Sequence, residues 1–333
     1  MSTNKRIDEL DVLKGIGIIL MMLDHCFAWG EKVFLHALIQ SFHMPLFFIV
    51  SGYLWQNKDK TTNFIRHKVN TILVPHFNFA IIYSLVFIGL FALGKISGEG
   101  TAKSIIALFM FSTRSDLTMF ASPIWFLQAL FLTEIVFTIL EKKTGKFCGW
   151  IVLIIAILGI TYSKVFSFML PFALEAFSTG ILFFYIGIRL KNVDWIKFEG
   201  RKYWLLLLMI VIWIGSICQN GCVDMRSARY YNPILYIVNG ALGTIIFWNI
   251  AHFISCHLKK LNNVLQHFSI CSITYLCVHY IFVFYGNRLL CRYLSFSGTA
   301  IKIILFVGVV LISWILNKMI MKYVPRLIGK KNV

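Results

Sequence analysis

The sequence predicts an all-α, polytopic membrane protein, a bundle of about ten transmembrane helices with both termini in the cytoplasm. Hydrophobic residues make up 59% of its 333 residues and charged residues 14%, a balance that excludes an ordinary soluble domain. Apolar runs long enough to cross a bilayer follow one another with only short polar segments between them. We therefore expect one integral-membrane domain over residues 1–333 and no separate soluble catalytic domain.

The apolar runs define the expected spans, taken in order along the chain. The ten runs cover approximately residues 11–29, 33–55, 71–94, 122–140, 149–163, 168–188, 203–218, 233–256, 269–288 and 299–320. A further run near 105–111 is too short to cross a bilayer, and we expect it to be re-entrant or interfacial.

The distribution of basic residues sets the orientation of these spans. The net charge of +18 would suit nucleic-acid binding, but the Lys and Arg residues are scattered over short loops between apolar spans. With the N-terminus inside, 21 of the 32 Lys and Arg residues fall in cytoplasmic segments, ten fall in outer segments and one lies within a span. Cytoplasmic loops carry such an excess of positive charge. Topology therefore explains the charge, and we expect no nucleic-acid partner.

The first span carries ionisable residues that a simple membrane anchor would lack. Lys14 and His25 are eleven residues apart, which at about 1100° of helical rotation places both on one face with a rise of ~16 Å between them. Charged groups within a membrane span are expensive and usually face the protein interior. A neutral imidazole such as His25 can accept a proton from a hydroxyl, so this face is a candidate site for general-base catalysis.

Each of these residues also has a purely structural interpretation. His25 could be a packing histidine bonded to a carbonyl, and Lys14 could extend to the cytoplasmic surface. Asp11 lies three residues before Lys14 and is expected to pair with it. Asp24 points about 100° away from His25, so a carboxylate from another helix would orient that ring better.

The second span contains a proline within a polar, aromatic stretch. Pro45 lacks a backbone N–H, so it frees the carbonyl of Ser41 and can open a polar site in a helix. His43 lies near the middle of this span and could line such a site. Alternatively, Pro45 marks a packed kink, and His43 satisfies a freed carbonyl.

Several further residues are candidates for binding or catalysis. Arg66 and Lys68 suit phosphate recognition, although the topology of the loop alone accounts for them. Trp125 opens the fourth span and could be an interfacial anchor. Glu175 lies ~10 Å inside the sixth span, where a buried carboxylate usually has a role, such as orienting a histidine of the first two spans. His279 is another imidazole in mid-span. The eight cysteines show no metal-ligand spacing, and we expect no metal site.

Several of these stretches together resemble the membrane acyltransferase 3 family, in particular its fucose 4-O-acetylase-like branch. The family's first span carries a basic residue, ten residues and then His, and this chain has Lys14 and His25 in that pattern. The second-span signature resembles Phe42-His43-Met44-Pro45-Leu46-Phe47-Phe48 followed by Ser51-Gly52-Tyr53. Further similar stretches follow in the family's order, and they are Leu73-Val74-Pro75, Trp125-Phe126-Leu127, 171–175 and 273–279. Lys14 stands where many members have Arg, and Glu175 where related chains more often carry Asp.

This resemblance implies an O-acyltransferase of the bacterial inner membrane, with acetyl-CoA as the cytoplasmic donor. The acceptor would be a sugar hydroxyl of an O-antigen, capsule or exopolysaccharide, presented as a polymer or a lipid-linked sugar. His25 becomes the essential imidazole and Glu175 a second catalytic residue. Lys14, Arg66 and Lys68 would contact the donor, and His43, Trp125 and His279 would line the acceptor cavity.

Two questions stay open at this stage. His25 acts either as general base on the sugar hydroxyl, the simpler version, or as a transient acyl acceptor, which would better explain transfer across the membrane. The rival function is a transporter or flippase for a lipid-linked sugar, which also needs buried polar residues in many spans. A flippase would not need the pattern of Lys14 and His25, and it should show paired broken helices. A receptor or scaffold is a weaker third interpretation.

Overall fold

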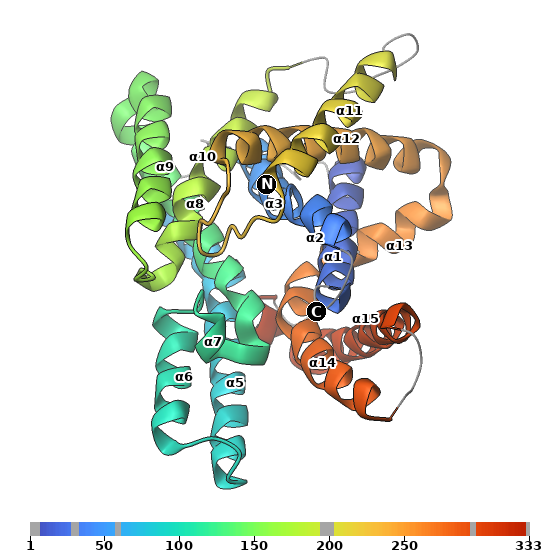
Figure 1. Ribbon diagram of the computed structural model, residues 1–333. Helices are drawn as coiled ribbons and strands as arrows, with labels where there is room; N and C mark the ends of the chain where they lie inside the picture. Colours follow the sequence, from blue (N-terminus) through green and yellow to red (C-terminus); the bar gives the residue numbers. More distant parts are fainter. Residues whose placement is uncertain (1–6, 28–32, 57–60, 194–202, 294–297, 331–333) are drawn as a thin grey trace. The chain divides into compact units, whose positions relative to one another are not determined.

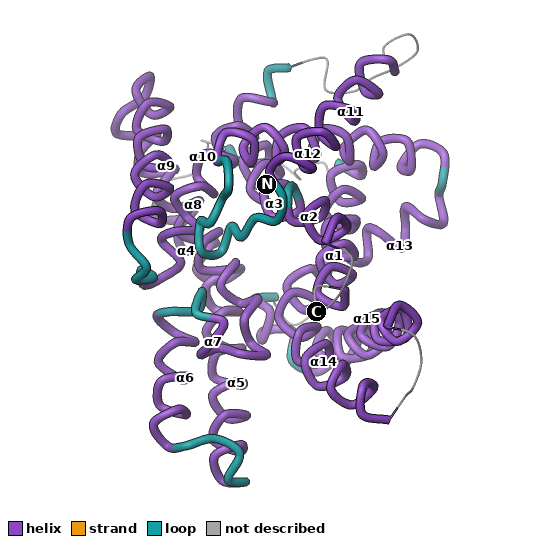
Figure 2. The backbone as a smooth tube through the Cα atoms, in the orientation of Figure 1, coloured by secondary structure: helices purple, strands orange, loops and turns teal. Residues whose placement is uncertain are grey.

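The computed structural model describes residues 7–27, 33–56, 61–193, 203–293 and 298–330. Over these residues the chain is built from helices, and it contains no β-strand apart from one isolated bridge between Asp224 and Arg229 (Figure 2). The expected all-α fold is therefore confirmed.

The chain divides into two compact units, each assembled from separated stretches. Unit 1 consists of Met1–Trp55, Phe183–Val223 and Tyr230–Ser272. Unit 2 consists of Gln56–Leu182, Asp224–Arg229 and Ile273–Val333. The expectation of a single domain over residues 1–333 is not tested by this division and stays a prediction.

Unit 1 is organised around its first helix. Its helices are α1 (Asp8–Phe27), α2 (Val33–Gln40), α3 (His43–Leu54), the second half of α10 (Leu174–Leu190), α11 (Tyr203–Asn220), α12 (Pro233–His257) and α13 (Lys259–Ile270). Helix α1 packs against α12, α13 and α3, and α11 packs on α12 (Figure 1). With α2, which it also contacts, the predicted first span therefore touches four other helices of its unit.

Unit 2 contains the remaining helices. They are α4 (Thr61–Lys68), η1 (Val69–Leu73), α5 (Val74–Ala92), α6 (Gly98–Met110), α7 (Ser115–Thr118), η2 (Met119–Ile124), α8 (Trp125–Thr144), η3 (Gly145–Phe147), α9 (Cys148–Val165), η4 (Pro171–Ala173), the first half of α10, α14 (Ser272–Tyr293), α15 (Gly298–Tyr323) and η6 (Pro325–Ile328). Helix α5 packs against α6, and α8 packs against α4, η1 and α9.

Seven of the described helical stretches are long and apolar enough to cross a membrane, or eight if the bent pair α13–α14 is one span. The predicted count of about ten is larger for two reasons. Helix α1 is too charged to qualify, because residues 10–27 include Asp11, Lys14 and Asp24. The stretch Ser115–Val165 is one apolar run that contains both α8 and α9. Each of the ten predicted spans overlaps a helix, and the short run near 105–111 lies mostly in α6.

The second predicted span differs from the structure in one respect. Residues 33–55 form two helices, α2 and α3, which are separated at Ser41 and Phe42. Pro45 lies in the first turn of α3, and without an N–H it cannot donate to the carbonyl of Ser41 four residues earlier. The break at Ser41 and Phe42 lies four and three residues before Pro45, where its missing N–H removes a hydrogen bond, so it agrees with the interpretation of Pro45 as a kink.

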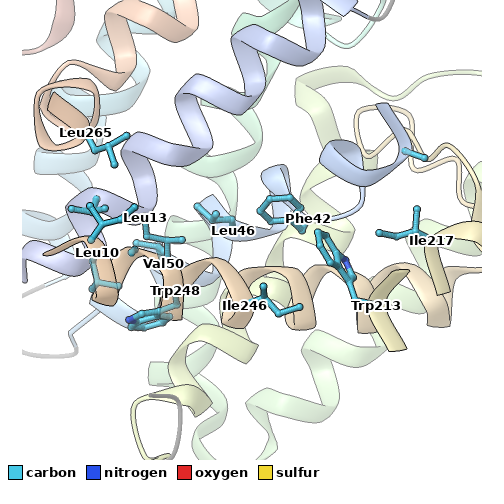
Figure 3. Close-up of a cluster of buried hydrophobic side chains, with 14 residues drawn as sticks. Leu10, Leu13, Phe42, Leu46, Val50, Trp213, Ile217, Ile246, Trp248 and Leu265 are labelled. Carbon is cyan, nitrogen blue, oxygen red and sulfur yellow. The ribbon is translucent and has the colours of Figure 1, made fainter. Parts of the chain in front are cut away.

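A cluster of buried hydrophobic side chains holds α1 in unit 1 (Figure 3). Its labelled members come from α1, α3, α11, α12, α13 and the link between α2 and α3, and they are Leu10, Leu13, Phe42, Leu46, Val50, Trp213, Ile217, Ile246, Trp248 and Leu265. Phe42 stacks on Phe247 with ring centroids 4.4 Å apart and meets Trp213 edge-on at 5.4 Å. In a membrane such packing stabilises helix association through van der Waals contact, because lipid is as apolar as the side chains.

Two glycines allow helix backbones in unit 1 to approach closely. A Cβ atom at Gly15 of α1 would collide with the carbonyl oxygen of Leu265 on α13, and one at Gly52 of α3 would collide with that of Phe184 on α10. Small residues permit this kind of close packing in membrane helix bundles. Gly15 lies one residue after Lys14, so this contact places the backbone beside Lys14 directly against α13.

Candidate functional site

The structure has the predicted helix face on which Lys14 and His25 lie together. Helix α1 is unbroken from Asp8 to Phe27, so Lys14 and His25 lie on one side of a single helix. Ile18 and Met21, which lie between them on this face, are each 2% exposed. Lys14 and His25 are half-buried. The face therefore points into protein along its middle, as expected for a span that carries ionisable groups.

Lys14 is anchored at its base by a carboxylate. Its Nζ atom lies 2.7 Å from Oδ1 of Asp11, which confirms the predicted pair. The hydroxyl of Ser269 on α13 donates to the same Asp11 oxygen at 2.9 Å. Asp11 is 5% exposed, so this carboxylate is buried between α1 and α13 and is satisfied by two donors. The Lys14 side chain, 27% exposed, keeps part of its surface accessible.

The opposite end of α1 carries a polar network that the sequence pattern did not reveal. Asp24 is 1% exposed. Its Oδ1 accepts a hydrogen bond from Nδ1 of His36 at 2.6 Å, and its Oδ2 accepts one from the Gln40 amide at 2.5 Å. His36 and Gln40 are four residues apart and so share one face of α2. That spacing was the available signal.

His43 is buried at the start of α3, with 2% of its surface exposed. Its Nδ1 atom donates to the carbonyl of Ile39 at 2.9 Å. This carbonyl belongs to the last turn of α2 and also accepts from the backbone N–H of Phe42 at 3.3 Å. His43 therefore bonds a backbone carbonyl, as its structural interpretation expects, but this carbonyl is that of Ile39 and not the one of Ser41 that Pro45 frees.

The N-terminal end of α1 carries a second buried carboxylate bound to a histidine. Glu9 is 8% exposed. Its Oε2 accepts from Nδ1 of His252 at 2.7 Å, and its Oε1 accepts from the indole N–H of Trp248 at 3.2 Å. His252 and Trp248 are four residues apart on α12. Glu9 therefore ties the start of α1 to the last turns of α12.

In unit 2, Lys68 and Arg66, the two cations predicted to bind the acyl donor, have different surroundings. Lys68 forms an ion pair with Glu134 of α8, with Nζ 2.7 Å from Oε2, and this carboxylate is 4% exposed. Arg66, two residues earlier on α4, is exposed. Lys68 is therefore paired with a buried carboxylate, whereas the Arg66 side chain lies at the surface.

Trp125 is 8% exposed at the start of α8, close to a buried network that sequence reasoning missed. His76 donates through Nδ1 to the carbonyl of Ile124 at 3.3 Å, and its Nε2 accepts from the Gln128 amide at 2.9 Å. The same amide donates to the carbonyl of Phe109 at 2.7 Å, and its oxygen accepts from Ser112. His76 and Gln128 are 52 residues apart, so no local pattern could have paired them.

Glu175 is buried in the first turn of α10, with 3% of its surface exposed. Its Oε1 accepts a hydrogen bond from the backbone N–H of Leu170, which holds the segment that enters α10. Its Oε2 is buried and has no hydrogen-bond partner among the described residues. Phe172 and Ala173, just before it, adopt positive φ angles of 57° and 56°, which are costly for residues other than glycine. The strained turn and the buried oxygen mark this end of α10 as a candidate site.

His279 is fully buried in α14. Its Nδ1 donates to the carbonyls of Tyr275 and Leu276, at 2.7 and 3.0 Å, within its own helix. These two bonds fix the orientation of the ring within α14. The neighbouring Cys277 carbonyl accepts from the hydroxyl of Tyr83 on α5, which ties α14 to the rest of unit 2.

The eight predicted site residues thus fall into two groups. Lys14, His25 and His43 belong to unit 1, and Arg66, Lys68, Trp125, Glu175 and His279 belong to unit 2. Within unit 1, α1 carries both Lys14 and His25, and its two ends hold the Asp24 and Glu9 networks. Their catalytic and binding roles stay predictions.

Comparison with known proteins gives a match to a family model. The model described as an acyltransferase domain, Acyl_transf_3, matches residues 7–318, which is nearly the whole chain. Neither the curated proteins nor the solved structures gave a match.

Proposed function

The chain belongs to the acyltransferase 3 family, and from this premise we propose that it is a membrane O-acyltransferase that moves acetyl from acetyl-CoA to a sugar hydroxyl. The acceptor is a cell-envelope polysaccharide or its lipid-linked precursor, in the manner of the fucose 4-O-acetylase-like branch. The protein works in the bacterial inner membrane, where acetyl-CoA arrives from the cytoplasm. The observation that carries the proposal is the face of α1 on which Lys14 and His25 are joined by one unbroken helix.

In the proposed reaction, His25 acts as general base. It accepts the proton of the sugar hydroxyl while the hydroxyl oxygen attacks the carbonyl carbon of the thioester. The C–S bond of the thioester then breaks, and the CoA thiol leaves with the proton. His25 is half-buried, so part of its side chain stays accessible to a bound substrate, as this role requires.

The other predicted residues divide into donor and acceptor contacts. Lys14 and the exposed Arg66 suit the phosphates of CoA, whereas Lys68 would have to share its charge with Glu134. His43, Trp125 and His279 are buried side chains that suit the wall of an acceptor cavity. The unpartnered Oε2 of Glu175 could accept a hydrogen bond from a sugar hydroxyl or orient an imidazole.

The test is mass spectrometry of envelope glycans from cells that express the wild-type chain, His25→Ala, His25→Gln or His257→Ala, with and without mild alkali. His257 is the matched control, an exposed histidine whose Nδ1 donates to the Phe253 carbonyl of its own helix. We expect an alkali-labile acetyl group with the wild type and the control, and a loss of about a hundredfold or more in both His25 variants.

Equal acylation by the His25 variants would contradict the assigned base. If no glycan were acylated while glycan export depended on the protein, the transporter interpretation would replace the enzyme.

A further inference from the structure

Cys256 lies at the last turn of α12 with an exposed thiol. It follows His252 by four residues, so the two side chains share one face of the helix. The Cys256 Sγ atom lies 3.9 Å from Nε2 of His252. This is within the distance of a weak hydrogen bond from sulfur. A thiol and an imidazole are therefore in contact at the end of this helix.

The imidazole is oriented by a carboxylate on the side away from the thiol. Its Nδ1 donates to Oε2 of Glu9 at 2.7 Å. In the neutral ring, this bond places the proton on Nδ1 and leaves the lone pair of Nε2 directed toward sulfur. The other oxygen of Glu9 is held by Trp248 at 3.2 Å. Thiol, imidazole and buried carboxylate follow the order in which a nucleophile, its base and the group that orients the base are arranged in covalent catalysis.

The surroundings of Cys256 favour an anionic electrophile. Lys259 and Lys260, three and four residues further on, are exposed. They lie in a segment that the charge distribution places in the cytoplasm, together with the residues before Asp11. Four other cysteines, Cys26, Cys148, Cys271 and Cys277, are buried and so less accessible to a large donor.

We propose that Cys256 is a nucleophile that accepts an acyl group from an acyl thioester with a phosphorylated carrier, with His252 as its base and Glu9 as the residue that positions the base. His252 takes the thiol proton, and sulfur attacks the carbonyl carbon of the donor. The C–S bond of the donor breaks, and its thiol leaves with the proton from His252. The product is an S-acyl group on Cys256 and a free carrier thiol. The proposal rests on the proposed function only for the nature of the donor.

The experiment uses the full-length protein in detergent, incubated with acetyl-CoA and quenched in acid. Peptide mass spectrometry then identifies acetylated cysteines, and neutral hydroxylamine separates thioesters from amides. We expect a hydroxylamine-labile acetyl group on Cys256, absent in Cys256→Ser and formed about a hundredfold more slowly in His252→Gln. Glu9→Gln should slow the reaction less. Cys218→Ser is the matched control, because Cys218 is also exposed, on α11, and should leave acetylation unchanged.

A second measurement does not depend on the donor. Iodoacetamide should alkylate Cys256 faster than Cys218 at neutral pH, and His252→Gln should remove the difference. Equal alkylation rates for the two thiols would overturn the proposal, as would acetylation of Cys256 that His252→Gln leaves unchanged. If glycan acetylation persists in Cys256→Ser and no S-acetyl group forms, the thiol proposal fails while the proposed function stands. If S-acetylation occurs and no glycan is acetylated, the proposed function fails while the thiol proposal stands.

Discussion

The two ends of α1 are built from the same parts but bind different neighbours. At each end a buried carboxylate accepts a hydrogen bond from Nδ1 of a histidine, Asp24 from His36 at 2.6 Å and Glu9 from His252 at 2.7 Å. Asp24 binds α2, whose His36 is 12 residues away in sequence, whereas Glu9 binds α12, whose His252 is 243 residues away. One network is local, and the other joins distant parts of the chain.

The packing around the two networks explains what each one contributes. The Glu9 end lies beside the hydrophobic cluster that includes Leu10, Leu13 and Trp248, so packing holds α1 to α12 even without the carboxylate (Figure 3). Helix α2 has only eight residues, too few to be stable by itself. We therefore expect the polar contacts of Asp24 to matter more for the position of α2 than those of Glu9 matter for α12.

The largest effect is expected for Asp24→Ala. The substitution leaves the donors of His36 and Gln40 without their acceptor, and Asp24 is 1% exposed, so water cannot easily replace it. We expect a loss of about 3 kcal/mol in the free energy of unfolding. Thermal unfolding of the detergent-solubilised protein measures it. Asp24→Asn is the control, because it keeps one acceptor and should lose less. A wild-type midpoint for Asp24→Ala would show that α2 does not depend on this network.

A smaller effect is expected for Glu9→Ala. His252 and Trp248 lose their acceptor, but His252 is partly exposed and can bond water instead. The hydrophobic cluster stays in place, so we expect a loss of about 2 kcal/mol in the free energy of unfolding. The same thermal measurement compares it with Asp24→Ala. A larger loss at Glu9 than at Asp24 would reverse the comparison and make the distant contact the stronger one.

The contrast between the two ends also explains which features the sequence could reveal. The face of Lys14 and His25, the pair of Lys14 with Asp11 and the positions of the helices depend on spacing within one helix, and the structure has all three. The partners of Glu9 and His76 lie on other helices, so only the fold brings them together. The break at Ser41 and Phe42 also has a local signal, because Pro45 cannot donate to the carbonyl four residues before it.

Lys14 lies between the two ends, and its substitution should have a modest effect on stability. Lys14→Met removes one donor from Asp11, and the donor of Ser269 remains. We expect a loss of about 1 kcal/mol in the free energy of unfolding, since the Lys14 side chain is 27% exposed and the pair is partly screened. Lys14→Arg keeps the charge and should recover most of the stability. If Lys14 also contacts acetyl-CoA, Lys14→Met should raise KM for the donor by more than its thermal midpoint alone would suggest.

The smallest effect on stability is expected for an ion pair that is exposed to water. It gives the lower limit against which the buried carboxylates Glu9 and Asp24 are compared. Glu99 and Lys103 on α6 form an ion pair with Oε1 and Nζ 2.6 Å apart, and their side chains are 76% and 59% exposed. The hydrogen bond and charge of Lys103 lower the pKa of Glu99. Its contribution to stability is therefore present above the pKa of Glu99 in the unfolded chain. That contribution is lost as the pH falls through the lowered pKa of the folded state.

Because both groups are solvated, Lys103→Ala should leave the thermal midpoint within about 2 °C of wild type at neutral pH. Any difference should vanish in acid, where Glu99 is protonated in both proteins, and should shrink at high salt because ions screen exposed charges. Glu99→Gln is the control and should behave like Lys103→Ala. A difference as large as that of Glu9→Ala would mean that burial does not distinguish these carboxylates. The contrast between the ends of α1 would then need a cause other than the packing around them.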